Sequence, residues 1–121
     1  MYTVEEIKTN RKVWTDALRS GRFKQGMMKL CMKGLDDEYH YCCLGVACEV
    51  AGEFGISLVK NEHNADYMSY NGALTTLPTH VRMSLGLSVS DLSELIRKND
   101  LGASFAKIAD YIDSLPITKD E

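Results

Sequence analysis

The sequence predicts a single compact α+β domain over residues 1–121, with two β-hairpins and about four to five helices. Apolar residues alternate with polar ones around turn-forming segments in the first two thirds of the chain, which is typical of hairpin strands. At both ends of the chain they recur every three or four residues between capping signals, which is typical of helices. With 45% hydrophobic and 26% charged residues, a chain of 121 residues can bury one core. Residues 117–121 are expected to form a frayed tail.

The first helix is predicted to begin after Thr3. Thr3 and Glu6 have the spacing of a capping box, in which each side chain accepts a hydrogen bond from the other residue's amide. Apolar residues then share one side of the helix until Ser20 and Gly21. Glycine can adopt the left-handed conformation that ends many helices, so the helix should stop there.

A β-hairpin is predicted over residues 29–33 and 38–42, where apolar and polar residues alternate. The Gly-Leu-Asp-Asp segment between them has the residues that turns favour. This pairing places Cys31 opposite either Tyr41 or Cys42. The one-residue choice decides which face of the sheet each side chain takes.

The middle of the chain predicts a second hairpin. Residues 56–59 read as a short strand and residues 60–65 as a polar loop. Asn71 and Gly72 favour a two-residue type I′ turn, so residues 73–76 should return antiparallel to residues 67–70.

Four more helices are predicted from helical spacing and from their start and stop signals. Ser88 with Asp91 forms a second capping box, Ser104 is an N-cap, and Pro116 ends the last helix. The expected ranges are residues 43–54, 78–85, 88–98 and 104–115.

The charge of the chain excludes some partners. The net charge of −3 comes from 14 basic and 17 acidic residues that are interleaved, so no basic stripe is present to bind duplex nucleic acid. The longest apolar run, residues 44–47, is far below the ~20 residues that cross a membrane. Glu5, Glu6 and Lys8 interrupt any signal peptide. We therefore expect a cytoplasmic protein with reduced thiols and no membrane partner.

The four cysteines are the first candidates for chemistry. Cys31, Cys42, Cys43 and Cys48 are spaced by 11, 1 and 5 residues, whereas zinc sites usually use pairs two to four apart. His40 could add a ligand beside Cys42, but the pattern favours no metal and no cofactor. The alternative is that the thiols are small buried side chains, with Cys31 and Cys42 meeting across the hairpin.

Cys43 could also be a nucleophile, because a helix N-terminus stabilises a thiolate. A cysteine enzyme needs a base as well, and the sequence places none of His40, His63 and His80 beside Cys43. We therefore assign no catalytic residue. If the protein is an enzyme, the candidate groups are Cys43, Asp100 and His40.

A ligand site is a further possibility in the segment that follows the first helix. Arg19, Arg22 and Lys24 are cations that could bind a phosphate, with Phe23 as a stacking surface and Gln25 as an amide partner. The spacing is not that of a phosphate-binding loop. The alternative is a solvated connection anchored by Phe23.

Asn99 and Asp100 could present an amide and a carboxylate to a ligand or to Mg²⁺, although one carboxylate is a poor magnesium site. The alternative is a structural role, because Asn and Asp are ordinary residues at helix ends and in turns. Trp14 and Tyr41 could form a pair that stacks on a base. The favoured alternative is that Trp14 is a core aromatic and Tyr41 an aromatic at the edge of the core. The full set of candidate ligand-binding residues is Arg19, Arg22, Phe23, Lys24, Gln25, Tyr41, Cys43, Asn99 and Asp100.

Several segments together resemble a family of small, largely uncharacterised proteins encoded by bacteriophages and some bacteria. The resemblance is carried by the Cys-Cys-Leu-Gly-Val sequence from Cys42, by the Asn-Asp pair, and by the Ser-Phe-Ala-Lys-Ile-Ala-Asp-Tyr-Ile segment from Ser104. Lys98 departs from it, because similar proteins tend to have an apolar residue there. The segments lie at residues 14–21, 23–26, 41–46, 77–78, 99–100 and 104–112.

The resemblance implies a phage-encoded protein in the bacterial cytoplasm and supplies no catalytic residue. The resulting hypothesis is a non-catalytic accessory protein that binds a host protein or sequesters a small phosphorylated, nucleotide-like ligand, and so counteracts host defence. The alternative is a small enzyme acting on a nucleotide or a host macromolecule. A virion component is disfavoured, and self-association is compatible with the sequence.

Overall fold

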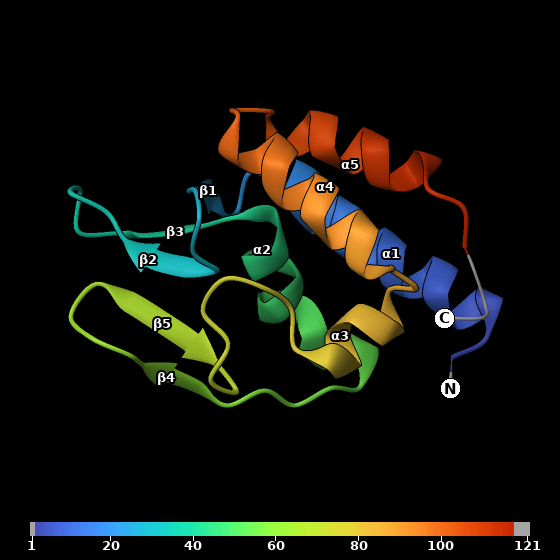
Figure 1. Cartoon of the computed structure of the whole chain (residues 1–121), viewed down its shortest axis with the longest axis horizontal. Helices are drawn as coiled ribbons and strands as arrows, with labels where there is room; N and C mark the ends of the chain where they lie inside the picture. Colours follow the sequence, from blue (N-terminus) through green and yellow to red (C-terminus); the bar gives the residue numbers. More distant parts are fainter. Residues whose placement is uncertain (1, 118–121) are drawn as a thin grey trace.

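The computed structural model describes residues 2–117 of the chain. These residues form five α-helices and a mixed five-stranded sheet (Figure 1). This confirms the predicted α+β class. The helices are α1 (Val4–Arg19), α2 (Cys43–Val50), α3 (Thr79–Ser84), α4 (Val89–Asp100) and α5 (Phe105–Ser114), and a 3₁₀ turn, η1 (Ala51–Phe54), follows α2. The strands are β1 (Lys24–Gln25), β2 (Cys31–Lys33), β3 (Tyr39–Tyr41), β4 (Lys60–Glu62) and β5 (Tyr67–Tyr70). Four residues of the predicted tail, 118–121, lie outside the described range.

The helix caps are those that the sequence predicts. The amide of Glu6 donates to Thr3 Oγ1 at 3.0 Å, and the amide of Thr3 donates to Glu6 Oε1 at 2.8 Å. Ser88 and Asp91 form the same reciprocal pair at the start of α4. Ser104 caps α5. Each cap satisfies amides that a helix start would otherwise leave without a partner.

The sheet has the strand order β1-β3-β2-β5-β4. β2 and β3 form the predicted hairpin, with Cys31 opposite Tyr41, which settles its register. β1 is an additional strand that the sequence analysis missed, and it pairs with β3 in parallel. Two residues are too few to give an alternating pattern, so no sequence signal marked this strand.

The second predicted hairpin is wrong in its pairing. The strand lies at residues 60–62, which we expected to be loop, and not at residues 56–59. Residues 73–76 form no strand, and Ala73 makes a single bridge to Tyr70. The physical reason is that β5 already pairs with β2 on one side and β4 on the other. The backbone of Asn71 and Gly72 does take positive φ angles, of 51° and 85°, as the turn prediction requires.

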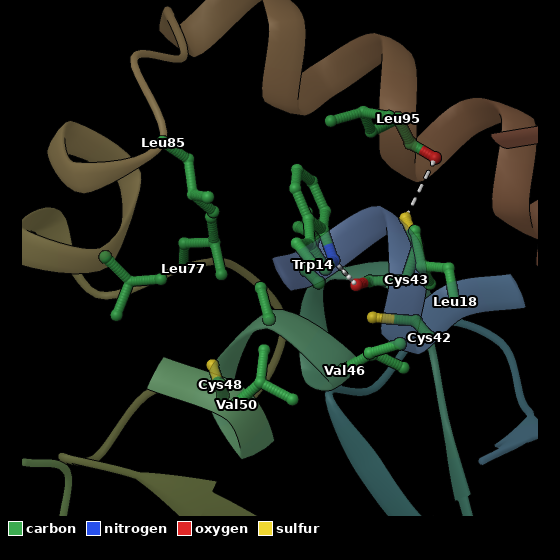
Figure 2. Packing of buried hydrophobic residues seen from close by; sticks show 14 of the residues in the cluster. Trp14, Leu18, Cys42, Cys43, Val46, Cys48, Val50, Leu77, Leu85 and Leu95 are labelled. Atoms are coloured by element: carbon green, nitrogen blue, oxygen red, sulfur yellow. Dashed lines mark hydrogen bonds between the residues drawn. The ribbon is translucent and has the colours of Figure 1, made fainter. Parts of the chain in front are cut away.

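The α2 helix lies between the sheet and helices α1 and α4 (Figure 1). Every residue of α2 except Glu49 is buried. In the core, Trp14 from α1 donates its indole N–H to the carbonyl oxygen of Cys43 at 2.9 Å (Figure 2). A buried indole needs such a partner, so this bond fixes α1 against the first turn of α2.

All four cysteines are reduced and buried. Cys48 lies among the core side chains shown in Figure 2, and Cys31 is fully buried on β2. These positions agree with the reading of the thiols as small apolar side chains. The expected pairing of Cys31 with Cys42 across the hairpin is wrong, because the register places Cys31 opposite Tyr41. Within residues 2–117, no helix is long and apolar enough to cross a membrane.

Candidate functional site

The structure brings four of the nine candidate ligand-binding residues together at the C-terminal end of α4. Gln25, Cys43 and Asn99 share one hydrogen-bonded network, and Asp100 lies beside it. The other five are elsewhere in the basic segment or on the sheet. These five are Arg19, Arg22, Phe23, Lys24 and Tyr41.

Asn99 is the centre of the network and is only 1% exposed. Its Oδ1 accepts from the amide of Cys43 at 3.1 Å and from Gln25 Nε2 at 3.1 Å. Its Nδ2 donates to the carbonyl of Gly26 at 2.8 Å. Asn99 therefore caps the N-terminus of α2 from another helix, and its burial leaves almost none of its surface for a ligand to contact.

Gln25 extends the same network to the last helix. Its Nε2 also donates to the carbonyl of Ala103 at 2.7 Å, and its Oε1 accepts from the amide of Phe105 at 3.1 Å. The Gln25 side chain thereby joins β1 to the loop between α4 and α5. These bonds give the half-buried Gln25 and the buried Asn99 a structural role, because amides withdrawn from water need hydrogen-bond partners.

Cys43 is fully buried, and its thiol donates toward the carbonyl oxygen of Leu95 at 3.8 Å (Figure 2). Burial raises the pKa of this thiol well above its ordinary value, and the neighbouring Cys42 adds to the rise. The helix N-terminus that could have activated the thiolate is outweighed by desolvation. Cys43 in this conformation is a poor nucleophile.

The candidate bases and metal ligands do not converge on Cys43. The His40 ring contacts the Asp36 carboxylate at 3.0 Å on the hairpin, and its other nitrogen is 3.5 Å from the carbonyl oxygen of Gln25. Among the residues that the structure describes, no three His, Cys, Asp or Glu side chains are grouped as metal ligands. Within that range the geometry therefore offers no metal-ligand group, and the hydrogen bond of the Cys43 thiol is to a backbone carbonyl and not to a base.

The cations of the basic segment face carboxylates of the protein itself. Arg19 pairs with Asp110 and Asp113 of α5 at 2.7 and 2.8 Å. Lys24 pairs with Asp36 and Glu38 of the hairpin at 3.0 and 2.8 Å. These pairs reduce the positive charge that a phosphate would meet.

Phe23, the aromatic residue of the basic segment, packs edge-on against Tyr41 of β3. The rings of Phe23 and Tyr41 have centroids 5.3 Å apart at an interplanar angle of 83°. The Arg22 guanidinium lies 4.8 Å from the Phe23 centroid. Phe23 thus anchors the loop, as in the alternative that the sequence analysis left open.

Three exposed apolar residues are at or next to the two residues that the Met28–Asp100 hydrogen bond joins. Met27, Met28 and Leu101 are 52%, 66% and 72% exposed. The amide of Met28 donates to Asp100 Oδ1 at 2.9 Å and holds Met28 at a φ of 72°. We call Met27, Met28, Asp100 and Leu101 the Met28 surface.

The sequence predicts Asp100 as a candidate binding residue but gives no signal for the apolar part of this surface. Two consecutive methionines are visible in the sequence, but apolar residues are normally read as core. The cavity beneath Met28 has a volume of about 10 Å³, which holds no ligand larger than a water molecule. The Met28 surface can therefore bind a partner on its exposed side, but it cannot enclose a ligand in a pocket.

The fold and this corner define a small α+β domain with a polar network under an exposed apolar surface. The chain belongs to the family described as a domain of unknown function, DUF8296, whose model matches residues 5–115. No curated protein and no solved structure matches the chain. The family match includes the Cys-Cys-Leu-Gly segment and the Asn99–Asp100 pair.

Proposed function

We propose that this chain is a non-catalytic, phage-encoded accessory protein that binds a host protein through the Met28 surface. The observation that carries the proposal is the exposure of three large apolar side chains at and next to the residues that the Met28–Asp100 hydrogen bond joins. Contiguous exposed apolar side chains rimmed by polar groups are typical of protein interaction sites. The resemblance to phage proteins supplies the setting, which is a phage genome and the bacterial cytoplasm. Interference with host defence is part of the proposal itself.

The backbone of Met28 supports a binding role. A residue other than glycine in the left-handed region costs about 1–2 kcal/mol. Glycine would remove that cost, yet the chain carries a long apolar side chain there, 66% exposed. Methionine is also suited to binding, because its flexible thioether adapts to a partner's surface.

The chemistry of the surface indicates the chemistry of its partner. Its centre is apolar, and Asp100 gives it a negative charge within a chain of net charge −3. The expected partner is a host protein that presents an apolar side chain next to a lysine or arginine, because such a charge complements Asp100 and favours encounter.

Sequestration of a nucleotide-like ligand is a weaker alternative. It rests on the Arg22–Phe23 pair, where a guanidinium and a ring lie 4.8 Å apart. Arg19 and Lys24 are already engaged by carboxylates. The enzyme alternative is weaker still, because Cys43 is buried and His40 bonds to Asp36.

The substitution Met28→Gly separates binding from folding. It deletes the side chain and relieves the positive φ, so the melting temperature should stay the same or rise. Affinity for the host partner should fall at least about tenfold, as for a residue at the centre of an interface. The partner is identified by affinity capture from bacterial lysate, then purified, and its binding is measured by calorimetry.

Met83→Ala is the matched control, because Met83 is an exposed methionine on α3, away from this surface. It should bind the partner as the wild type does. Equal affinity of the Met28→Gly and wild-type proteins would refute the Met28 surface. A nucleotide that co-purifies in native mass spectrometry and is lost in Arg22→Ala would replace the proposal by the sequestration alternative.

A further inference from the structure

Three tyrosines and a glutamate surround the ammonium group of Lys60. Its Nζ lies 5.5 Å from the ring centroid of Tyr39 and 5.6 Å from those of Tyr41 and Tyr70. It also lies 2.6 Å from Glu49 Oε2. We call Tyr39, Tyr41, Tyr70 and Glu49 the tyrosine cage. None of these contacts belongs to the Met28 surface.

Strand register explains why these side chains meet. Lys60 of β4 lies directly opposite Tyr70 of β5, so the two side chains share a face of the sheet. Tyr39 and Tyr41 are two residues apart on β3 and share a face with each other. Glu49 comes from α2 and accepts a hydrogen bond from the Tyr70 hydroxyl.

The cage is suited to a positive charge. Burial raises the pKa of Tyr41 and of Tyr70, and the Glu49 carboxylate raises both further, so these rings stay neutral phenols. Neutral aromatic faces attract cations through their quadrupoles. The Glu49 carboxylate adds a full negative charge, which an ammonium group neutralises.

The cage differs from the other lysine–tyrosine contacts of the protein in the number of its rings and in its distances. Elsewhere in the protein, Lys98 Nζ lies 4.6 Å from the Tyr111 centroid and Lys29 Nζ lies 4.9 Å from that of Tyr67. Lys60 is farther from each of its three rings. Several aromatic rings around one cation are the arrangement that recognises quaternary ammonium and methyl-lysine groups.

The tyrosine cage is also accessible to solvent, and the Lys60 ammonium group can move out of it. Tyr39 is 42% exposed, and the Lys60 side chain is 32% exposed. β4 is an edge strand that pairs only with β5, and all three of its residues are exposed. The Lys60 side chain can therefore rotate into solvent without unpairing the centre of the sheet.

We propose that the tyrosine cage is a binding site for an alkylated ammonium group, and that Lys60 occupies it as an internal competitor in the free protein. The ligand class includes the methylated lysine side chain of a protein and small quaternary amines. Both carry the same cation, and either can displace Lys60. The proposal goes beyond the proposed function and does not rest on it.

Removing the competitor tests the proposal. Lys60→Ala and the wild type are titrated with tetramethylammonium chloride, and the tyrosine ring signals are followed by NMR. Saturable binding is expected in Lys60→Ala and should be at least about tenfold weaker in the wild type, where Lys60 must first leave. The double variant Lys60→Ala/Tyr39→Leu should lose about tenfold in affinity, because one cage wall is removed.

Ammonium chloride at equal concentration is the control for ionic strength, and Lys60→Gln is the second variant in case Lys60→Ala does not fold. Trimethyllysine peptides and choline are then compared: tighter binding of the peptide assigns the site to a protein ligand, and tighter binding of choline assigns it to a small amine. If neither folded variant binds tetramethylammonium saturably, the proposal is wrong. It is also wrong if ammonium chloride gives the same shifts, or if Tyr39→Leu changes nothing.

Discussion

Replacing Arg11 by methionine is expected to lower the free energy of unfolding by about 3–5 kcal/mol, because several buried carbonyl oxygens each lose a donor at about 1–3 kcal/mol. Arg11 lies on α1 and is 6% exposed. Its Nε donates to the carbonyl of Leu85 at 2.7 Å, and its Nη2 to that of Gly86 at 2.9 Å. Its Nη1 donates to the carbonyl of Leu115 at 2.8 Å.

These acceptors explain how a guanidinium can be buried without a carboxylate of residues 2–117 in hydrogen-bonding distance. Leu85 and Leu115 are the C-caps of α3 and α5, where helix dipoles concentrate negative charge. Burial lowers the pKa of Arg11, and Asp91 partly opposes that shift through its charge. Arg11 thus fastens the ends of two helices to α1.

Urea unfolding followed by circular dichroism measures the loss. Lys12→Met is the matched control, because Lys12 is the exposed neighbour on the same helix and should change stability by less than ~0.5 kcal/mol. Arg11→Lys should also be destabilised, since an ammonium group cannot span three carbonyls. An Arg11→Met protein with the stability of the wild type would show that these bonds do not hold the helix ends.

Gly45→Ala is the second substitution with a large expected effect. A Cβ at this position would lie 1.8 Å from the carbonyl oxygen of Leu30 and 2.7 Å from its carbonyl carbon. The obstacle is backbone and cannot rotate away, so α2 must move away from the segment that leads into β2. Overpacking of this kind costs about 3 kcal/mol or more.

Gly52→Ala is the control, because a Cβ there meets nothing within 4 Å. It should leave the melting temperature unchanged or raise it. A Gly45→Ala protein as stable as Gly52→Ala would contradict the close contact between α2 and Leu30. If the contact holds, the glycine of the Cys-Cys-Leu-Gly segment is required for packing and not for chemistry.

The parts of the fold that could be predicted are those with local signals. The capping boxes at Thr3 and Ser88 and the hairpin that pairs Cys31 with Tyr41 depend on residues close in sequence. The turn at Asn71 and Gly72 was also predicted, but its pairing was wrong. Strand β5 pairs with β2, which is distant in sequence. The residues of the turn cannot indicate that a distant strand occupies the edge of β5 where residues 73–76 were expected to pair.

In the candidate site, too, the local features could be predicted and the long-range contacts could not. The sequence predicts Gln25 and Asn99 as ligand-binding residues, but the hydrogen bond between them joins residues 74 apart, so no local signal indicates their structural role. Arg19 was chosen for its charge, and its carboxylate partners lie on the last helix. Arg11 could have been found, because it lies four residues after Ile7 and three before Trp14 in the apolar stripe of α1.

Lys98 shows how one departure from the family resemblance is accommodated. Its ammonium group lies 4.6 Å from the Tyr111 ring centroid and 3.5 Å from Glu94 Oε2. The aliphatic part of a lysine can cover the apolar surface that a hydrophobic side chain would cover, while its charge remains at the edge. The corner before Asn99 therefore stays packed.

If Cys43 is a core residue and the protein acts by binding, the alkylation rates of the four thiols in the native protein must follow unfolding. Burial raises the pKa of Cys42 to about 11 and that of Cys43 well above its ordinary value, so thiolates are scarce near neutral pH. Iodoacetamide labelling, resolved by residue with mass spectrometry, should modify Cys43 only as fast as the protein unfolds. Fast, selective labelling of Cys43 in the folded protein, with loss of its activity, would contradict this account and identify a nucleophile.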